Sequence, residues 1–325
     1  MSTVRIGSVC TGYGGLDAAV QEVFGGSLAW VADNDPGASR ILAHHHPRVP
    51  NLGDITAVDW EDVEPVDIVC GGYPCQPFSL AGELKGTADD RHIWPFIARA
   101  LGVLRPRVAV FENVANHLRL GFDTVLCDLA DLGFDVEWCV VRADEVGAPH
   151  QRRRLIVLAT AADAPHLGHE RGRSARGGRS GLADRNLAAA DAEGAGWAKG
   201  CGVADAGDGT ARRTRQGESA RDGAQRVSGS GVDWGEFAPA ITRWETVLGR
   251  PAPGPTDDLG RLSPLFVEWL MGLPIGHVTG VPDLSRSAQL KALGNGVLPH
   301  QAIAGLRHLA TRMDTVRQRG MGVAA

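Results

Sequence analysis

The sequence predicts an α/β fold with a doubly wound, mostly parallel sheet, and three observations support this prediction. Short apolar runs alternate with amphipathic stretches along the first half of the chain, as expected for strands separated by helices. Glycine or acidic residues directly follow several of these runs, as they do at the carboxyl ends of parallel strands. The 325 residues are 43% hydrophobic, enough for one α/β domain and a smaller second unit.

The first predicted element is a strand over residues 4–9. It is followed by Cys10-Thr-Gly-Tyr-Gly-Gly-Leu-Asp17 and then by a helix that extends to Phe24. At such a glycine turn, backbone N–H groups and the helix dipole can meet a polar ligand. The pattern is weak evidence alone, because it lacks the full dinucleotide-binding fingerprint.

Two acids after this turn strengthen the prediction of a ligand site. A second strand, Leu28–Ala32, ends at Asp33, where an acid can bind ribose hydroxyls. Asp54 follows Leu52-Gly53, which we interpret as a similar strand end. Each acid taken alone is more typical of a helix N-cap or a solvated turn. Together, the successive strand ends favour a nucleoside-bearing cofactor.

The chain is organised around residues 66–79, where an apolar strand ending in Gly71-Gly72 leads into a loop that carries Cys75. Pro74 and Pro77 restrict the backbone on both sides of this cysteine, so its thiol is held in place. An open α/β sheet places reactive groups on loops of this kind. For the loop alone, a buried structural thiol is an equally good interpretation.

Further elements follow in order. We predict helices at 94–104, 118–133, 264–271 and 299–313, an ordered segment at 234–248, and strands at 108–111, 136–142 and 155–160. The strand at 108–111 delivers Glu112-Asn113-Val114 to the edge that carries Cys75. The strand at 155–160 is preceded by Gln151-Arg-Arg-Arg154. Such a run of arginines is usually a solvated face. At this edge of the sheet, it could instead hold an anion or a base.

Composition divides the chain into three parts. Residues 1–160 form the predicted cofactor-binding domain, and 259–325 the C-terminal motifs and helix that return to it. Between them, residues 161–258 include a stretch rich in glycine and arginine that can bury little apolar surface. We expect 165–230 to be largely disordered without a ligand, with a flexible linker as the alternative.

Charge and cysteine content restrict the classes of protein. The formal net charge is −5, so any nucleic-acid contact must depend on local arginine clusters. The six cysteines form no CxxC pair, which favours reduced thiols over disulfides or zinc ligands. Without a signal peptide or an apolar run long enough to span a bilayer, we expect a soluble, cytoplasmic protein that makes no membrane contact.

Taken together, the motifs resemble those of the C5-type cytosine DNA methyltransferases. The resemblance covers about 1–160 and 259–310. It depends on five ordered motifs: Thr11-Gly-Tyr-Gly-Gly-Leu-Asp17, Gly71-Gly-Tyr-Pro-Cys-Gln-Pro-Phe-Ser79, Glu112-Asn-Val114, Gln151-Arg-Arg-Arg154 and Gly294-Asn-Gly-Val297. It implies a Rossmann-like methyltransferase fold in which 161–258 is the smaller, irregular target-recognition domain.

The resemblance also implies a catalytic set. Cytosine C5 is too weak a nucleophile to take a methyl group directly, but a thiolate that adds at C6 pushes electron density toward C5. This attack is assigned to Cys75, and protonation or hydrogen bonding at N3 to Glu112. Arg154 would hold the base O2, and Arg152 would support Cys75 and Glu112. The target base must be flipped out of duplex DNA.

The implied cofactor is S-adenosylmethionine, with no metal. It would lie across the glycine turn, with Asp33 on the ribose and Asp54 near the adenine amino group. The full implied set is Thr11, Gly12, Gly14, Gly15, Asp33, Asp54, Pro74 and Asn295. Cys10 stands where the family commonly has a phenylalanine that stacks on adenine.

Three functions stay open at this point. The first is a DNA cytosine methyltransferase that acts as a monomer, alone or beside a cognate restriction endonuclease. The second is an RNA cytosine methyltransferase, because one branch of the family acts on tRNA. The third is a catalytically inactive DNA-binding relative, although such a protein has no need of Cys75, Glu112 and Arg154 together.

Overall fold

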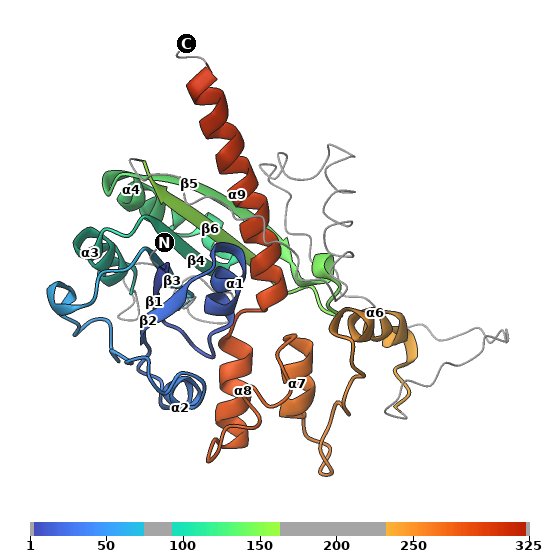
Figure 1. Cartoon of the computed structure of the whole chain (residues 1–325). Helices are drawn as coiled ribbons and strands as arrows, with labels where there is room; N and C mark the ends of the chain where they lie inside the picture. Colours follow the sequence, from blue (N-terminus) through green and yellow to red (C-terminus); the bar gives the residue numbers. More distant parts are fainter. Residues whose placement is uncertain (1–2, 75–92, 163–231, 323–325) are drawn as a thin grey trace.

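The computed structural model describes residues 3–74, 93–162 and 232–322. Within them, one sheet has the strand order β2-β1-β3-β4-β6-β5 (Figure 1). The strands are β1 (Arg5–Val9), β2 (Ser27–Ala32), β3 (Ile68–Gly71), β4 (Val108–Val114), β5 (Phe134–Arg142) and β6 (Arg153–Ala161). Apart from the one expected before Asp54, the predicted strands are therefore confirmed, with shifts at their ends.

The sheet is parallel in one part and antiparallel in the other. β1 pairs in parallel with β2 and β3, and β3 with β4. β6 is antiparallel to both β4 and β5. The short connection from Arg142 to Arg153 explains the antiparallel pairing of β5 with β6, because a parallel pair would need a long crossover between its strands.

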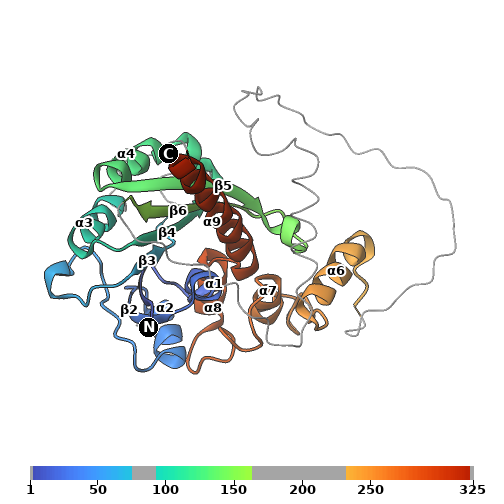
Figure 2. The ribbon, with the colours of Figure 1, turned by 45° about the horizontal axis from the view of Figure 1, so that its top comes forward.

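Helices cover both faces of the sheet, which confirms the doubly wound arrangement. The helices are α1 (Gly15–Phe24), α2 (Pro36–His45), α3 (Trp94–Leu104), α4 (Phe122–Asp131), α6 (Ala238–Leu248), α7 (Pro264–Leu270), α8 (Arg286–Asn295) and α9 (Pro299–Gly322). α1 and α9 lie on one face, and α3 and α4 on the other (Figures 1 and 2). The short 3-10 helices are η1 (Trp60–Asp62), η3 (Ala115–Arg119), η4 (Ala143–Val146) and η5 (Gly235–Phe237).

Strand β4 shows how the sequence builds these two layers. Val108 and Val110 belong to the core beneath α1 and α9, whereas Ala109 and Phe111 belong to the core beneath α3 and α4. Successive side chains of a strand point to opposite faces. Burial on both faces therefore explains why residues 108–111 are all apolar, and this run was readable as a strand for that reason.

A third apolar cluster joins the C-terminal segments to the sheet. It includes Trp244 of α6 and Trp269 of α7, together with Ala143 and Val146 of η4. Trp244 Nε1 also donates a hydrogen bond of 3.0 Å to the Trp269 carbonyl oxygen. The segments after residue 232 are thus packed onto the loops at one edge of the sheet.

Two helix predictions were wrong in extent. The helix expected at 118–133 is divided into η3 and α4, because Gly121 adopts a left-handed conformation with φ of 80° and begins α4. The last helix continues to Gly322 instead of ending at 313. α8 was missed because it has no clear apolar face, and Leu293 is its buried residue.

The strand expected before Asp54 was also wrong. Residues 50–54 contain no strand, and a single bridge joins Asn51 to Val31. Asp54 still lies beside the end of β2, because Leu52 N donates a 2.8 Å hydrogen bond to the Val31 carbonyl oxygen.

Several predictions lie outside the described residues, among them those for Cys75 and for disorder over 165–230. Over the ranges that the structure covers, none of the helices is long and apolar enough to cross a membrane.

Candidate active site

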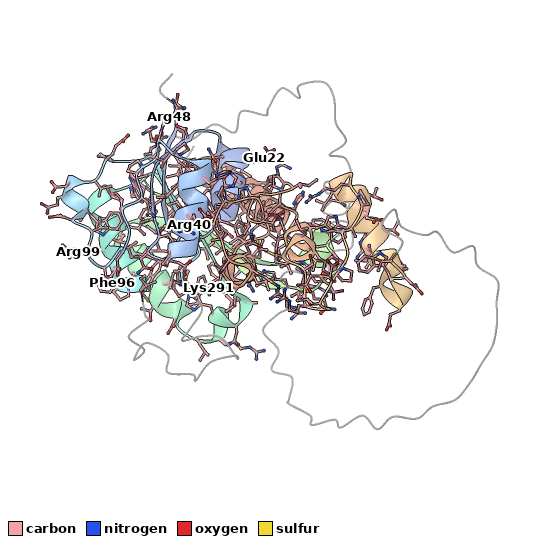
Figure 3. All side chains as sticks on the ribbon, turned by 90° about the horizontal axis from the view of Figure 1, so that it is seen from below. Glu22, Arg40, Arg48, Phe96, Arg99 and Lys291 are labelled. Carbon is pink, nitrogen blue, oxygen red and sulfur yellow. The ribbon has the colours of Figure 1, made fainter. Side chains whose placement is uncertain are left out.

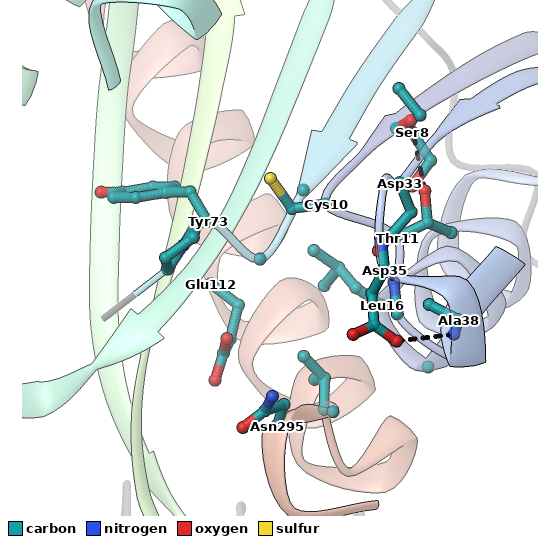
Figure 4. A pocket seen from close by; sticks show the side chains of 18 of the residues that line it. Ser8, Cys10, Thr11, Leu16, Asp33, Asp35, Ala38, Tyr73, Glu112 and Asn295 are labelled. Atoms are coloured by element: carbon teal, nitrogen blue, oxygen red, sulfur yellow. Dashed lines mark hydrogen bonds between the residues drawn. The ribbon is translucent and has the colours of Figure 1, made fainter. Parts of the chain in front are cut away.

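A cavity of about 420 Å³ opens at the carboxyl ends of β1, β3 and β4. Most of the predicted site residues line it, namely Thr11, Gly12, Gly15, Asp33, Asp54, Pro74, Glu112, Arg154 and Asn295. Gly14 and Arg152 are not in its lining. The side chains of Glu112, from β4, and of Asn295, from the end of α8, lie on the same side of this cavity (Figure 4).

The glycine turn forms one wall of the cavity. Gly12 and Gly14 have φ values of 60° and 83°, which favour glycine over other residues. A Cβ atom added at Gly15 would lie 2.3 Å from the Val297 carbonyl oxygen, so the turn and the segment 294–297 touch closely. Tyr13, between these glycines, donates a 2.6 Å hydrogen bond to the same carbonyl oxygen.

Asp33 closes the end of the cavity at β2. Its Oδ2 atom accepts a 2.8 Å hydrogen bond from Gly12 N, and Oδ1 accepts one of 2.9 Å from Asp35 N. Burial raises the pKa of this carboxyl, although both backbone hydrogen bonds oppose the shift. Lys291 forms an ion pair with Asp35 and so joins α8 to the start of α2. Figure 3 labels Lys291 and, on α2, Arg40.

Asp54 is a more exposed acid at the same end. Hydrogen bonds from Thr56 N, at 3.0 Å, and from Thr56 Oγ1, at 2.8 Å, lower its pKa. This carboxylate is therefore ionised at neutral pH and available as an acceptor.

Cys10 also lines the cavity, in a left-handed conformation with φ of 51°. Burial, with the charges of Asp33 and Asp54, raises its thiol pKa to about 12. The thiol therefore stays protonated at neutral pH and is a contact group, because nucleophilic attack needs a thiolate.

An ion pair stands at the β4 end of the cavity. Arg154 Nε lies 2.6 Å from Glu112 Oε1, and both side chains are largely buried. Antiparallel pairing of β4 with β6 brings the two strands together and sets Val114 opposite Arg154. Burial raises the pKa of Glu112, while Arg154 and then Arg152 oppose this shift. Burial prevails, so this carboxyl binds a proton more readily than an ordinary glutamate.

Arg152 lies behind this pair and contacts the C-terminal motif. Its NH2 group donates hydrogen bonds to the carbonyl oxygens of Gly294, at 3.1 Å, and Gly296, at 2.6 Å. Gln301, which the sequence analysis missed, donates 2.6 Å hydrogen bonds from Nε2 to the carbonyl oxygens of Arg152 and Val141. No local pattern marks Gln301, because its partners are distant in sequence.

Cys75 lies outside the described residues, but the chain leading to it is well held. Tyr73 is buried, and its hydroxyl lies 2.7 Å from His117 Nε2. Asn113 Nδ2 donates a 3.4 Å hydrogen bond to the Tyr73 carbonyl oxygen. Pro74 then lines the cavity.

A glycine turn and two acids at the carboxyl edge of an open α/β sheet define a class of protein. They are typical of α/β proteins that bind a nucleoside-bearing cofactor in a cavity at this edge.

Comparison with known proteins identifies the family within this class. Residues 4–176 match the family model described as C-5 cytosine-specific DNA methylase. Because this segment is more than half of the chain, the chain belongs to the C-5 cytosine-specific DNA methylase family.

Individual relatives agree with this assignment over part of their length. Type II methyltransferase M.NgoBV of Neisseria gonorrhoeae is 32% identical over 147 residues, which cover 42% of this chain and 35% of that protein. Type II methyltransferase M.NlaIV of Neisseria lactamica is 31% identical with the same coverage. The chain thus spans about a third of the length of these relatives.

A solved structure agrees with the fold. The Entamoeba histolytica methyltransferase EhMeth has a TM-score of 0.57 and 14% identity, covering 96% of this chain and 99% of that one. The similarity confirms the Rossmann-like fold.

Proposed function

We propose that this protein transfers a methyl group from S-adenosylmethionine to C5 of cytosine in duplex DNA. One observation carries the proposal: the buried Glu112–Arg154 pair lies at the same sheet edge as a glycine-lined cavity, in a chain of the C-5 cytosine-specific DNA methylase family.

The chemistry of the cavity supports this cofactor. Asp33 suits ribose hydroxyls, and the ionised Asp54 suits an amino group such as that of adenine. A Cβ atom added at Gly12 would meet nothing within 4 Å, which leaves room for a ligand against the turn. Pro74 and Asn295 complete the proposed surroundings. When bound, S-adenosylmethionine supplies an electrophilic methyl group on a sulfonium sulfur.

Glu112 and Arg154 are suited to a cytosine ring. The raised pKa of Glu112 lets its carboxyl hold a proton and donate it to the ring N3 as negative charge develops there. Arg154 is a fixed donor for the ring O2. The hydrogen bonds of Arg152 to Gly294 and Gly296 keep the arginine segment in place.

Cys75 is the proposed nucleophile. Its thiolate forms a bond to C6, and the electron pair displaced from the C5–C6 double bond makes C5 nucleophilic. Once C5 carries the methyl group, its proton leaves to a base and the electron pair expels the thiolate from C6. Cys75 directly follows Pro74, which lines the cavity.

Duplex DNA is the proposed partner, with the target base flipped into the cavity. We propose residues 161–258 as the target-recognition region, with arginine contacts to phosphates supplying affinity. Relatives named as type II methyltransferases favour a role in a restriction-modification system. We propose that the protein acts as a monomer, alone or beside a restriction endonuclease.

The decisive experiment measures tritium transfer from labelled S-adenosylmethionine to duplex DNA of mixed sequence and, in parallel, to RNA. The Cys75→Ala variant is the control, and nucleoside analysis locates the label. We expect label at cytosine C5 of DNA, absent with the variant. Transfer to RNA alone would replace the proposed substrate, and cofactor binding without any transfer would indicate an inactive relative.

A further inference from the structure

A buried carboxylate in the cavity has no role in the function proposed above. Asp17, in the first turn of α1, is 2% exposed and belongs to the cavity lining. Its Oδ1 atom accepts two hydrogen bonds, one of 2.6 Å from Ser8 Oγ and one of 3.3 Å from Cys70 Sγ. Both partners come from the sheet beneath the cavity.

The other oxygen of Asp17 is not satisfied. Among the described residues, Oδ2 is buried and has no hydrogen-bond partner. A Cβ atom added at Gly14 would lie 3.5 Å from Oδ2, so this oxygen lies next to the glycine turn. A buried acceptor without a partner is costly, more so when it is charged.

The charges around the cavity favour a cationic ligand. Of the described lining residues, Glu112 pairs with Arg154 and Asp35 with Lys291. Asp33 accepts hydrogen bonds with both oxygens, and Asp54 accepts two from Thr56. Asp17 differs because, among the described residues, its Oδ2 atom is buried and has neither a hydrogen-bond donor nor a cationic partner. The orphan Oε1 of Glu112 has Arg154 beside it, and Asp54 is exposed.

The position of Asp17 indicates which part of a cofactor it would meet. It contacts Ser8 on β1 and Cys70 on β3. These two strands lie between β2, which Asp33 follows, and β4, which carries Glu112. With the ribose at Asp33 and the methyl group directed toward Glu112, the amino-acid portion of the cofactor is left with the space above β1 and β3.

We propose that Asp17 is the acceptor for the α-ammonium group of the amino-acid portion of S-adenosylmethionine. The inference depends on the cofactor assigned in the proposed function. The ammonium group supplies the donor that Oδ2 lacks and balances a charge that the protein leaves unpaired. A carboxylate that only complements the dipole of α1 would need neither this burial nor a place in the cavity.

The test is a double-mutant cycle between protein and ligand. Calorimetric titration at pH 7.5 compares S-adenosylhomocysteine with its deaminated analogue, in which hydrogen replaces the α-amino group. We expect wild-type protein to bind the analogue at least about tenfold more weakly, the range of a charged hydrogen bond. In Asp17→Asn, which keeps an acceptor for Ser8, this preference should fall below about threefold.

Two further variants serve as controls. Asp17→Glu keeps the charge and should retain most of the preference. Asp128 lies on α4, outside the cavity lining, and its carboxylate accepts a hydrogen bond from Trp94 Nε1. Asp128→Asn should leave the preference for S-adenosylhomocysteine over its deaminated analogue unchanged.

The outcomes separate the two proposals. Equal penalties for loss of the amine in wild type and Asp17→Asn would overturn the role of Asp17 while leaving the cofactor assignment intact. The wild-type result is also sufficient without the variant, should Asp17→Asn not fold. Equal binding of S-adenosylhomocysteine and its deaminated analogue by wild type would overturn the inference. Failure of wild type to bind S-adenosylhomocysteine would overturn the proposed cofactor and this inference with it.

Discussion

At the scale of single residues, burial decides the chemistry of Asp17 and Glu112. Both carboxyls lie at the sheet edge with almost no exposure, and burial is the main cause of the raised pKa of each. They differ in their partners: Glu112 pairs with Arg154, whereas Asp17 has no cationic partner among the described residues. The same residue class therefore stands in two different charge environments at one sheet edge.

The stability of the ligand-free protein should report the titration of Asp17. Burial raises its pKa from 3.8 to about 6, against hydrogen bonds from Ser8 and Cys70, while the charge of Asp33 adds to the shift. Because the folded protein holds the proton of Asp17 more tightly than the unfolded chain, the protonated carboxyl stabilises the fold. This stabilisation is complete below pH 3.8 and is lost as pH rises through about 6. Asp17→Asn has no carboxyl at this position, so its stability does not change with pH for this reason.

We therefore expect the free energy of unfolding of wild type, relative to Asp17→Asn, to fall by about 2 kcal/mol between pH 4.5 and pH 8. Urea unfolding of both proteins at the two pH values provides the measurement. A constant difference across this range would show that Asp17 titrates as it does in the unfolded chain.

Loss of the Glu112 carboxyl should affect methyl transfer more than cofactor binding. Glu112→Gln removes the proposed proton donor, and general acid catalysis contributes about 100-fold or more to rate. We expect transfer to fall by that factor while the dissociation constant of S-adenosylhomocysteine changes by less than about threefold. Single-turnover transfer and calorimetry measure the two quantities.

Glu22→Gln is the matched control for this variant. Glu22 lies on α1 in an exposed ion pair with Arg307, and such pairs contribute little. Transfer by Glu22→Gln should match wild type. If Glu112→Gln kept its full rate, the assignment of Glu112 as proton donor would be wrong.

At the scale of elements, the glycine turn and the segment 294–297 form one packed unit. The ring of Tyr13 lies against Gly296, where an added Cβ atom would be 1.8 Å from Tyr13 Cε1. The Tyr13 hydroxyl reaches the Val297 carbonyl oxygen on the same segment. The two walls of the cavity thus depend on each other, although they are far apart in sequence.

Two glycine substitutions two residues apart should behave differently. Gly296→Ala forces Tyr13 aside, and we expect a loss of about 1–3 kcal/mol in unfolding free energy together with weaker cofactor binding. Gly294→Ala places a Cβ atom at a helical position with nothing within 4 Å and should be neutral or slightly stabilising. Thermal unfolding and calorimetric titration compare the pair, and equal effects would contradict close packing at Gly296.

At the scale of the whole molecule, the third apolar cluster joins the segments after residue 232 to the sheet. Trp244 is fully buried in this cluster, whereas Phe237, just before α6, is 63% exposed. Removal of a buried aromatic side chain typically costs about 3–5 kcal/mol. We expect Trp244→Ala to lose stability in that range and Phe237→Ala to stay within about 0.5 kcal/mol of wild type.

The same variants test whether these parts unfold together. Urea unfolding followed by circular dichroism and by tryptophan fluorescence should give coincident transitions in wild type, because the cluster spans α6, α7 and the loops of the sheet. Two separated transitions would show that the C-terminal segments unfold independently.

The sequence alone determined the local features of this protein. The run 108–111 of β4 was readable as a strand because burial on both faces makes it apolar at each position. The glycine turn was readable because positive φ values favour glycine. Helix α3 begins and ends as predicted. The motifs were also enough to indicate the family.

Only the tertiary structure decided which distant residues meet. It placed β6 between β4 and β5, so that Arg154 reaches Glu112, and it closed the cavity with the segment that carries Asn295. Asp17 stood in a motif that was plain in the sequence, but its burial and unsatisfied oxygen arise from β1, β3 and the glycine turn together. Local patterns encode backbone preference and burial, whereas contacts between distant elements depend on how the whole chain packs.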